Sequence, residues 1–158
     1  MFALSSREQA MEGRPMPRDD FEAELNHQHR HLRDLLSELG TLTRNPEGFE
    51  AAKGPLVAKL RALRETVQAH FAFEEEGGYM SDVLRKAPRF LPEVERLEAQ
   101  HTEILRDLDR LTRTDLEKTE PEAFLDEVHS LIERLGRHER EETDVVQRSV
   151  IEDTGTGD

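Results

Sequence analysis

Apolar residues recur at steps of three and four along most of the chain, which is the spacing of the buried face of an α-helix. No stretch alternates apolar and polar residues as a half-buried strand does. Proline, glycine and short polar segments interrupt the helical pattern. The sequence therefore predicts an all-α fold with four helices at about residues 18–43, 55–76, 92–113 and 121–151. Pro55, Pro92 and Pro121 each fall where a first helical turn tolerates proline.

The second and fourth predicted helices share one pattern when their inward-facing positions are compared at a shift of 68 residues (138 − 70). In both helices, four apolar positions are followed by a histidine and then, four residues later, by a glutamate. The second helix contributes Leu56, Leu60, Leu63, Val67, His70 and Glu74, and the fourth contributes Phe124, Val128, Leu131, Leu135, His138 and Glu142.

The first and third helices match in the same way at a shift of 72 residues (101 − 29), and in each a histidine replaces one apolar residue. The two sets are Leu25, His29, Leu32, Leu36 and Leu39, and Leu97, His101, Ile104, Leu108 and Leu111. The chain is therefore expected to consist of two similar helical hairpins that pack as an antiparallel up-down four-helix bundle over residues 18–151.

Six polar residues lie on these otherwise apolar faces, and burying them unpaired would cost several kcal/mol each. They are His29, His70, Glu74, His101, His138 and Glu142. A histidine and a glutamate four residues apart lie about 40° apart around a helix, so both side chains can reach one point. Four imidazoles and two carboxylates suit iron, manganese or zinc, and the carboxylates can bridge two ions. The sequence therefore predicts a metal centre with these six ligands.

The same residues give the chain a resemblance to a known family. The pattern His29, His70-Phe-Ala-Phe-Glu74, His101, His138-Glu-Arg-Glu-Glu142 resembles the hemerythrin-like, or HHE cation-binding, family over residues from about 20 to 146. This resemblance implies two non-haem iron ions with an oxo or hydroxo bridge, and zinc or manganese is the alternative metal. It implies that His29 and His70 bind one ion, that His101 and His138 bind the other, and that Glu74 and Glu142 bridge them.

Two positions depart from the oxygen-carrying members of the family. Those carriers have a second histidine four residues after the third-helix ligand, where this chain has Leu105, and a carboxylate five residues after the last histidine, where it has Thr143. The four-histidine set resembles more closely the family members linked to iron-centre repair and to nitric oxide or oxygen stress. Those repair proteins usually carry a cysteine-bearing N-terminal extension, whereas this chain has no cysteine.

Several residues near the predicted ligands have competing interpretations. His27 and His31 are four residues apart and form an alternative surface metal clamp, on the side of the helix away from His29. His129 lies about 180° from His138 and is expected to face water. Glu75 and Glu76 are also expected to face solvent, with a hydrogen bond that Glu75 accepts from a ligand imidazole as the alternative.

Three aromatic residues lie close to the second helix's ligands. Phe71 and Phe73 lie between His70 and Glu74 and are expected to pack as core or as a wall that keeps water from the metals. Tyr79 follows two glycines just beyond the predicted helix end. It is expected to be a packed loop residue, with a hydrogen bond to a metal-bound ligand or a redox-active phenol as the alternative.

The overall charge narrows the possible partners. With 22 Lys+Arg against 35 Asp+Glu, the net charge is −13, which argues against nucleic acids and anionic membranes. Without cysteine, disulfides and thiolate-bound metals are excluded. No apolar run approaches the roughly 20 residues of a membrane span, and the N-terminus does not resemble a secretion signal. We therefore expect a cytoplasmic protein, with a flexible arm at residues 1–17 and a polar tail at 152–158.

These observations lead to a main functional hypothesis and two alternatives. The main hypothesis is a di-iron protein that binds or senses a small molecule such as dioxygen, nitric oxide or peroxide, as a monomer or else a dimer. The first alternative is a di-iron enzyme for peroxide or nitric oxide reduction or for iron-centre repair. The second is a structural or adaptor bundle that a non-redox metal holds together.

Overall fold

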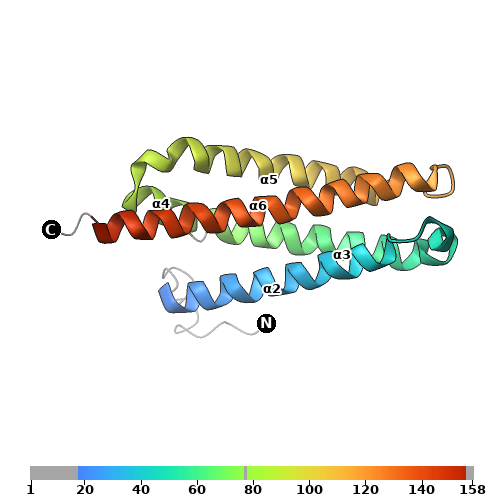
Figure 1. Cartoon of the computed structure of the whole chain (residues 1–158), viewed down its shortest axis with the longest axis horizontal. Helices are drawn as coiled ribbons and strands as arrows, with labels where there is room; N and C mark the ends of the chain where they lie inside the picture. Colours follow the sequence, from blue (N-terminus) through green and yellow to red (C-terminus); the bar gives the residue numbers. More distant parts are fainter. Residues whose placement is uncertain (1–17, 77, 156–158) are drawn as a thin grey trace, which may run out of the picture.

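Four long helices form an antiparallel bundle in the computed structural model, which describes residues 18–76 and 78–155 (Figure 1). The long helices of this described part are α2 (Arg18–Leu42), α3 (Phe49–Glu76), α5 (Leu91–Thr112) and α6 (Pro121–Gly155). Helix α2 packs on α3, α3 on α5, and α5 on α6. No strand occurs among these residues. The predicted all-α bundle of two hairpins is confirmed, while the expected arm at residues 1–17 lies outside the described residues.

Most of the apolar positions that the sequence pattern singled out lie in the bundle core. The four apolar positions of the α3 pattern have no exposed surface, and the four matching side chains on α6 are at most 2% exposed. The α3 positions are Leu56, Leu60, Leu63 and Val67. On α2, Leu36 is only half-buried and Leu35 is buried beside it. Each fully buried leucine contributes roughly 1.5–3 kcal/mol relative to an exposed one. The repeated apolar register is therefore the main reason that the four helices associate.

A second, smaller apolar cluster lies beyond the first and includes a helix that the sequence analysis did not predict. This helix is α4 (Tyr79–Lys86), and Gly78 precedes it with a φ of 84°, a conformation that favours glycine. Tyr79 therefore begins a helix instead of lying in a loop, and its side chain is outside the description. The cluster contains Met80, Val83, Ala87, Phe90, Val94, Leu97 and Val145. The predicted ligands lie between the two apolar clusters along the bundle.

A further difference from the prediction lies at the start of α3. This helix begins at Phe49, directly after the short 3₁₀ helix η1 (Pro46–Gly48), so Pro55 lies inside it. Proline at that position removes one hydrogen bond to the carbonyl of Ala51. Ala51 and Pro55 are exposed, so water can reach that carbonyl, and buried Phe49 holds the first turns by an edge contact with Phe124. At the other end of the chain, α6 extends to Gly155 instead of ending near residue 151.

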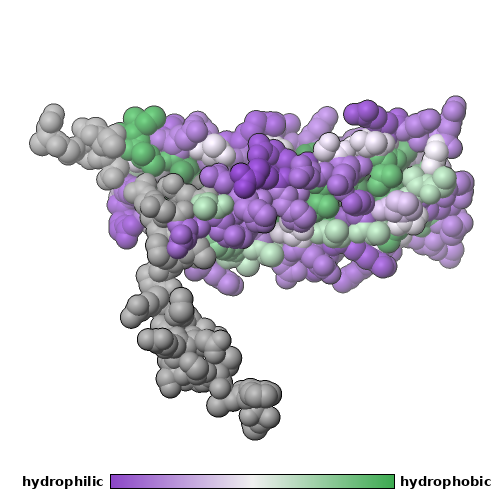
Figure 2. All heavy atoms as spheres, turned by 90° about the horizontal axis from the view of Figure 1, so that it is seen from below, coloured by the Kyte–Doolittle hydropathy of each residue, from purple (hydrophilic) through white to green (hydrophobic). Residues whose placement is uncertain are grey.

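The outer faces of the helices are strongly polar, as Figure 2 shows for one side of the bundle. Ion pairs between residues one helical turn apart, such as Lys53 with Glu50 and Arg148 with Asp144, occur on these faces. Among residues 18–76 and 78–155, none of the helices combines the length and the apolar content that a membrane span needs. A second short 3₁₀ helix, η2 (Pro88–Phe90), leads into α5.

His129 occupies an environment that the sequence analysis did not predict. It is half-buried instead of facing water, and its Nε2 atom lies 2.7 Å from the hydroxyl of Thr43. Thr43 is buried at the end of α2, where its hydroxyl donates to the carbonyl of Leu39 at 2.9 Å. The hydroxyl is therefore free to accept from the ring N–H of His129, and this contact joins the end of α2 to α6.

Candidate metal centre

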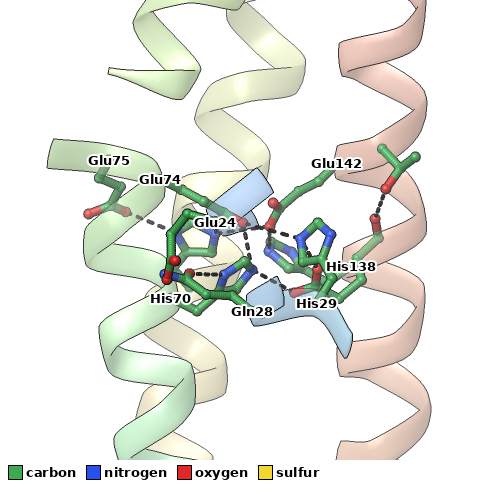
Figure 3. Close-up of polar contacts among 11 residues, drawn as sticks. Glu24, Gln28, His29, His70, Glu74, Glu75, His138 and Glu142 are labelled. Atoms are coloured by element: carbon green, nitrogen blue, oxygen red, sulfur yellow. Dashed lines mark hydrogen bonds and ion pairs between the residues drawn. The ribbon is translucent and has the colours of Figure 1, made fainter. Parts of the chain in front are cut away.

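Helices α3 and α6 each place a histidine and a glutamate in the same buried layer (Figure 3). On α3, the Nε2 atom of His70 lies 2.6 Å from Oε1 of Glu74. On α6, Nε2 of His138 is in close contact with Oε1 of Glu142. All four side chains are at most 1% exposed. The spacing of four residues therefore brings each imidazole and carboxylate together, as the sequence predicts.

Helices α2 and α5 contribute the remaining two histidines. Nε2 of His101 lies 3.3 Å from Oε1 of Glu142 and 3.4 Å from Oε2 of Glu74. Nε2 of His29 lies 4.0 Å from Oε1 of Glu74. The ring centroids of His29 and His70 are 4.9 Å apart, and those of His101 and His138 are 4.7 Å apart. The histidines thus pair within their own hairpins, as the resemblance implied.

Two overlapping groups of possible metal ligands result, and within each group the ligand atoms lie within 4.8 Å of one another. The first group contains His29, His70, Glu74, Glu139 and Glu142, and the second contains Glu74, His101, His138 and Glu142. Glu74 and Glu142 belong to both groups. The six predicted residues therefore come together, with two carboxylates placed between two pairs of histidines.

Glu139 is a member of the site that the sequence analysis missed. Its two carboxylate oxygens lie 2.9 Å from Nε2 of His29 and 3.2 Å from Nε2 of His70. The available signal is that Glu139 precedes Glu142 by three residues, which puts both on one side of α6. That signal is weak, because the run from Glu139 to Glu142 also resembles the charged outer face of a helix.

Hydrogen bonds outside the layer hold three of the imidazoles in place. The Nδ1 atom of His70 lies 2.9 Å from Oε1 of Gln28, whose amide nitrogen donates to Glu24 at 3.0 Å. This arrangement requires the Nδ1 atom of His70 to carry the proton, which directs Nε2 towards the site. Gln100, which matches Gln28 at the 72-residue shift, lies 2.7 Å from Nδ1 of His138.

Glu75 provides the third hydrogen bond of this kind. Its carboxylate lies 2.9 Å from Nδ1 of His101, although 44% of its side chain is exposed. Glu75 therefore contacts a ligand imidazole, as the alternative interpretation predicts, and does not only face solvent. Phe71 is buried against the imidazoles as expected, and Phe73 is half-buried.

Many nitrogen and oxygen atoms of this layer lack a hydrogen-bond partner in the described part of the chain, although the imidazole nitrogens and carboxylate oxygens approach one another closely. These unpartnered atoms are Nε2 of His29, His70 and His138, both oxygens of Glu74 and of Glu139, and Oε2 of Glu142. Buried polar atoms normally find partners, so a set of them that faces one region fits a bound ion there. Imidazole nitrogens and carboxylate oxygens are ligands for iron, manganese and zinc, so these residues fit a metal centre.

The carboxylates keep the two histidines of the first hairpin protonated in the metal-free site. Burial lowers the pKa of His29, but close contacts with Glu139 and Glu74 outweigh it and raise the pKa to about 8. Burial also lowers the pKa of His70, and the same two carboxylates raise it to about 10. Burial raises the pKa of Glu139, but its contacts with His29 and His70 outweigh that effect and lower the pKa to about 2.

The second hairpin has the opposite electrostatics. Burial, together with repulsion from His101, lowers the pKa of His138 to about 4. Burial and the neighbouring carboxylate of Glu74 raise the pKa of Glu142 well above its usual value. In the metal-free protein, His138 is therefore neutral at neutral pH, and burial beside Glu74 shifts Glu142 towards its protonated form.

Metal loading is expected to release about two protons per centre at neutral pH, because the ligands bind as neutral imidazoles and carboxylates. The protons come from His29 and His70, whose raised pKa values leave them protonated. Apparent metal affinity should therefore rise as the pH rises through about 8, the pKa of His29. Calorimetric titration in two buffers of different ionisation enthalpy measures the release, and a binding heat that does not depend on the buffer would contradict it.

The three histidines outside the layer should be dispensable for metal binding. His27 and His31 are exposed, and neither they nor His129 belong to the ligand groups found among the described residues. We expect His27→Ala and His129→Ala to keep full metal content by elemental analysis. His129→Ala should also lower the free energy of unfolding by roughly 1 kcal/mol, because it removes the hydrogen bond to buried Thr43. Loss of metal from His27→Ala would show that the wrong side of α2 had been assigned.

Comparison with known proteins agrees with this geometry. The family model described as the hemerythrin HHE cation-binding domain matches residues 20–148, which include every member of both ligand groups. No curated protein and no solved structure matches the chain. Because the family match covers most of the sequence, the chain belongs to the hemerythrin HHE cation-binding family.

Proposed function

We propose that this protein is a non-haem di-iron protein that binds or senses a small molecule such as dioxygen, nitric oxide or peroxide. The observation that supports this best is the sharing of Glu74 and Glu142 between two histidine pairs. Two carboxylates in that position suit a pair of bridged ions better than a single ion. Iron at such a centre supplies redox chemistry and coordination positions for a small ligand.

The residues around the centre have separate tasks in this proposal. Gln28, Gln100 and Glu75 fix three imidazole rings through their Nδ1 atoms, so that the Nε2 atoms face the metals. Buried Phe71 lies beside His101 and His138 and excludes water from one side of the centre. The apolar clusters on both sides of the layer limit access to molecules that are small.

Metal analysis combined with spectroscopy tests the proposal directly. Protein expressed with iron and purified without an affinity tag should contain about two irons per chain, with near-ultraviolet absorption of an oxo-bridged pair in air. Addition of nitric oxide or peroxide should then change that absorption. One zinc per chain, or iron whose spectrum responds to none of these molecules, would contradict the proposal and favour a structural metal.

A kinetic measurement separates binding from turnover. If the iron-loaded protein is a sensor or carrier, nitric oxide or peroxide in excess over the protein should be consumed only in proportion to the protein, even when a reductant is present. Sustained consumption over many equivalents would replace the proposal with a di-iron reductase.

A further inference from the structure

The two halves of the site differ at one pair of matching positions. The residue that follows the motif histidine is Phe71 on α3 and Glu139 on α6, and the shift of 68 residues makes these positions equivalent (139 − 71). Each of the two side chains approaches the histidine pair of the other hairpin. The otherwise repeated centre therefore has a carboxylate on one side and an aromatic ring on the other.

On the first side, Glu139 faces His29 and His70. Both of its carboxylate oxygens lie within ion-pair distance of their Nε2 atoms, at 2.9 and 3.2 Å. The side chain is 17% exposed, and neither oxygen has a hydrogen-bond partner within residues 18–76 and 78–155. A half-buried carboxylate whose two oxygens are themselves buried and face two candidate ligands is placed to join them at a metal ion.

On the second side, Phe71 faces His101 and His138. Its ring stacks on the imidazole of His101, with centroids 3.8 Å apart and an angle of 11° between the planes. It also makes an edge contact with His138 at 5.3 Å. An aromatic ring donates no ligand atom, so this histidine pair has only the two shared carboxylates as oxygen donors.

We propose that the two metal positions are inequivalent. Glu139 is a third carboxylate ligand of the ion held by His29 and His70, which makes that position the tighter of the two. Phe71 leaves the ion at His101 and His138 with four protein ligands and an exchangeable coordination position. The inference rests on the proposed function, since it requires two ions at this centre, and it assigns the small ligand to the His101 and His138 side.

Titration of metal-free protein with cobalt(II) against a competing chelator measures the two affinities without any need for redox chemistry. The wild type should show two classes of site that differ at least about tenfold in dissociation constant. Glu139→Gln keeps the shape of the side chain and removes its charge. It should weaken the tighter class by at least about tenfold and leave the weaker class unchanged. Glu133→Gln, an exposed position on the same helix, is the matched control and should alter neither class.

A second pair of variants assigns the classes to positions. His101→Ala should keep the tight class and lose the weak one, whereas His29→Ala should lose the tight class. The inference would be overturned, without the proposed function, if the two sites of the wild type had equal affinities. The same would follow if Glu139→Gln weakened both classes of site equally or weakened neither. Uptake of no cobalt, or of a single ion, would overturn it together with the proposed function. Two unequal classes in a protein whose iron form responds to no small molecule would support the inference and overturn the proposed function.

Discussion

Replacement of Glu142 with alanine is expected to lower the bound metal at both positions to less than about a tenth of the wild-type content. The carboxylate of Glu142 lies 3.3 Å from Nε2 of His101, is in close contact with His138, and belongs to both ligand groups. Removing a residue that merely orients a ligand typically costs about 10–100-fold in metal affinity, so losing a shared ligand should cost at least that much at each position. Elemental analysis after gel filtration measures the result.

Two further variants make this experiment specific. Glu133→Ala changes an exposed glutamate on the same helix and should keep the full metal content. His70→Ala should also lose most of the metal, since His70 is 1% exposed and its Nε2 atom faces two carboxylates. Helical content by circular dichroism shows whether each variant folds. If folded Glu142→Ala retained as much metal as Glu133→Ala, the shared-carboxylate arrangement would be wrong.

The fold was predictable because its cause is visible in the sequence. Helices that pack in a bundle bury residues at steps of three and four, and the chain repeats one such pattern in two hairpins. His70 and His138, placed on these apolar faces, were recognisable because a buried polar side chain needs a partner. The same reasoning identified six of the seven residues that the structure gathers in this layer, and missed only Glu139.

What the sequence did not predict depends on contacts between helices. Glu139 is the neighbour of a predicted ligand, but only the packing of α6 beside α2 brings its carboxylate to His29. His129 was expected in water because its side of α6 lies opposite the site, yet the end of α2 covers it through Thr43. Pro55 was expected to begin a helix, but α3 begins six residues earlier, at Phe49, which is buried (55 − 49). Local pattern contains no information about such contacts.

Removal of the metal is expected to lower the unfolding midpoint by about 15 °C. A ligand that binds only the folded state stabilises it by roughly 2.7 kcal/mol when its free concentration is 100 times its dissociation constant. Two ions together then contribute about 5 kcal/mol, and for a domain of this size each kcal/mol corresponds to roughly 3 °C. Thermal unfolding followed by circular dichroism, with and without a chelator, measures the shift. A midpoint that chelation leaves unchanged would show that the layer does not bind metal in the folded protein.

The pH dependence of that shift provides a stricter test, because the metal-free site depends on protonated histidines. The pKa values of His29 and His70 are raised from 6.5 to about 8 and about 10, so their contribution to stability is fully present below about pH 6.5. It is lost as the pH rises through about 8 and then about 10. Metal-bound imidazoles are already deprotonated, so the loaded protein should not weaken in this way. The difference between the two midpoints should therefore widen from about pH 7 to about pH 9, and a constant or narrowing difference would contradict the assigned protonation of His29 and His70.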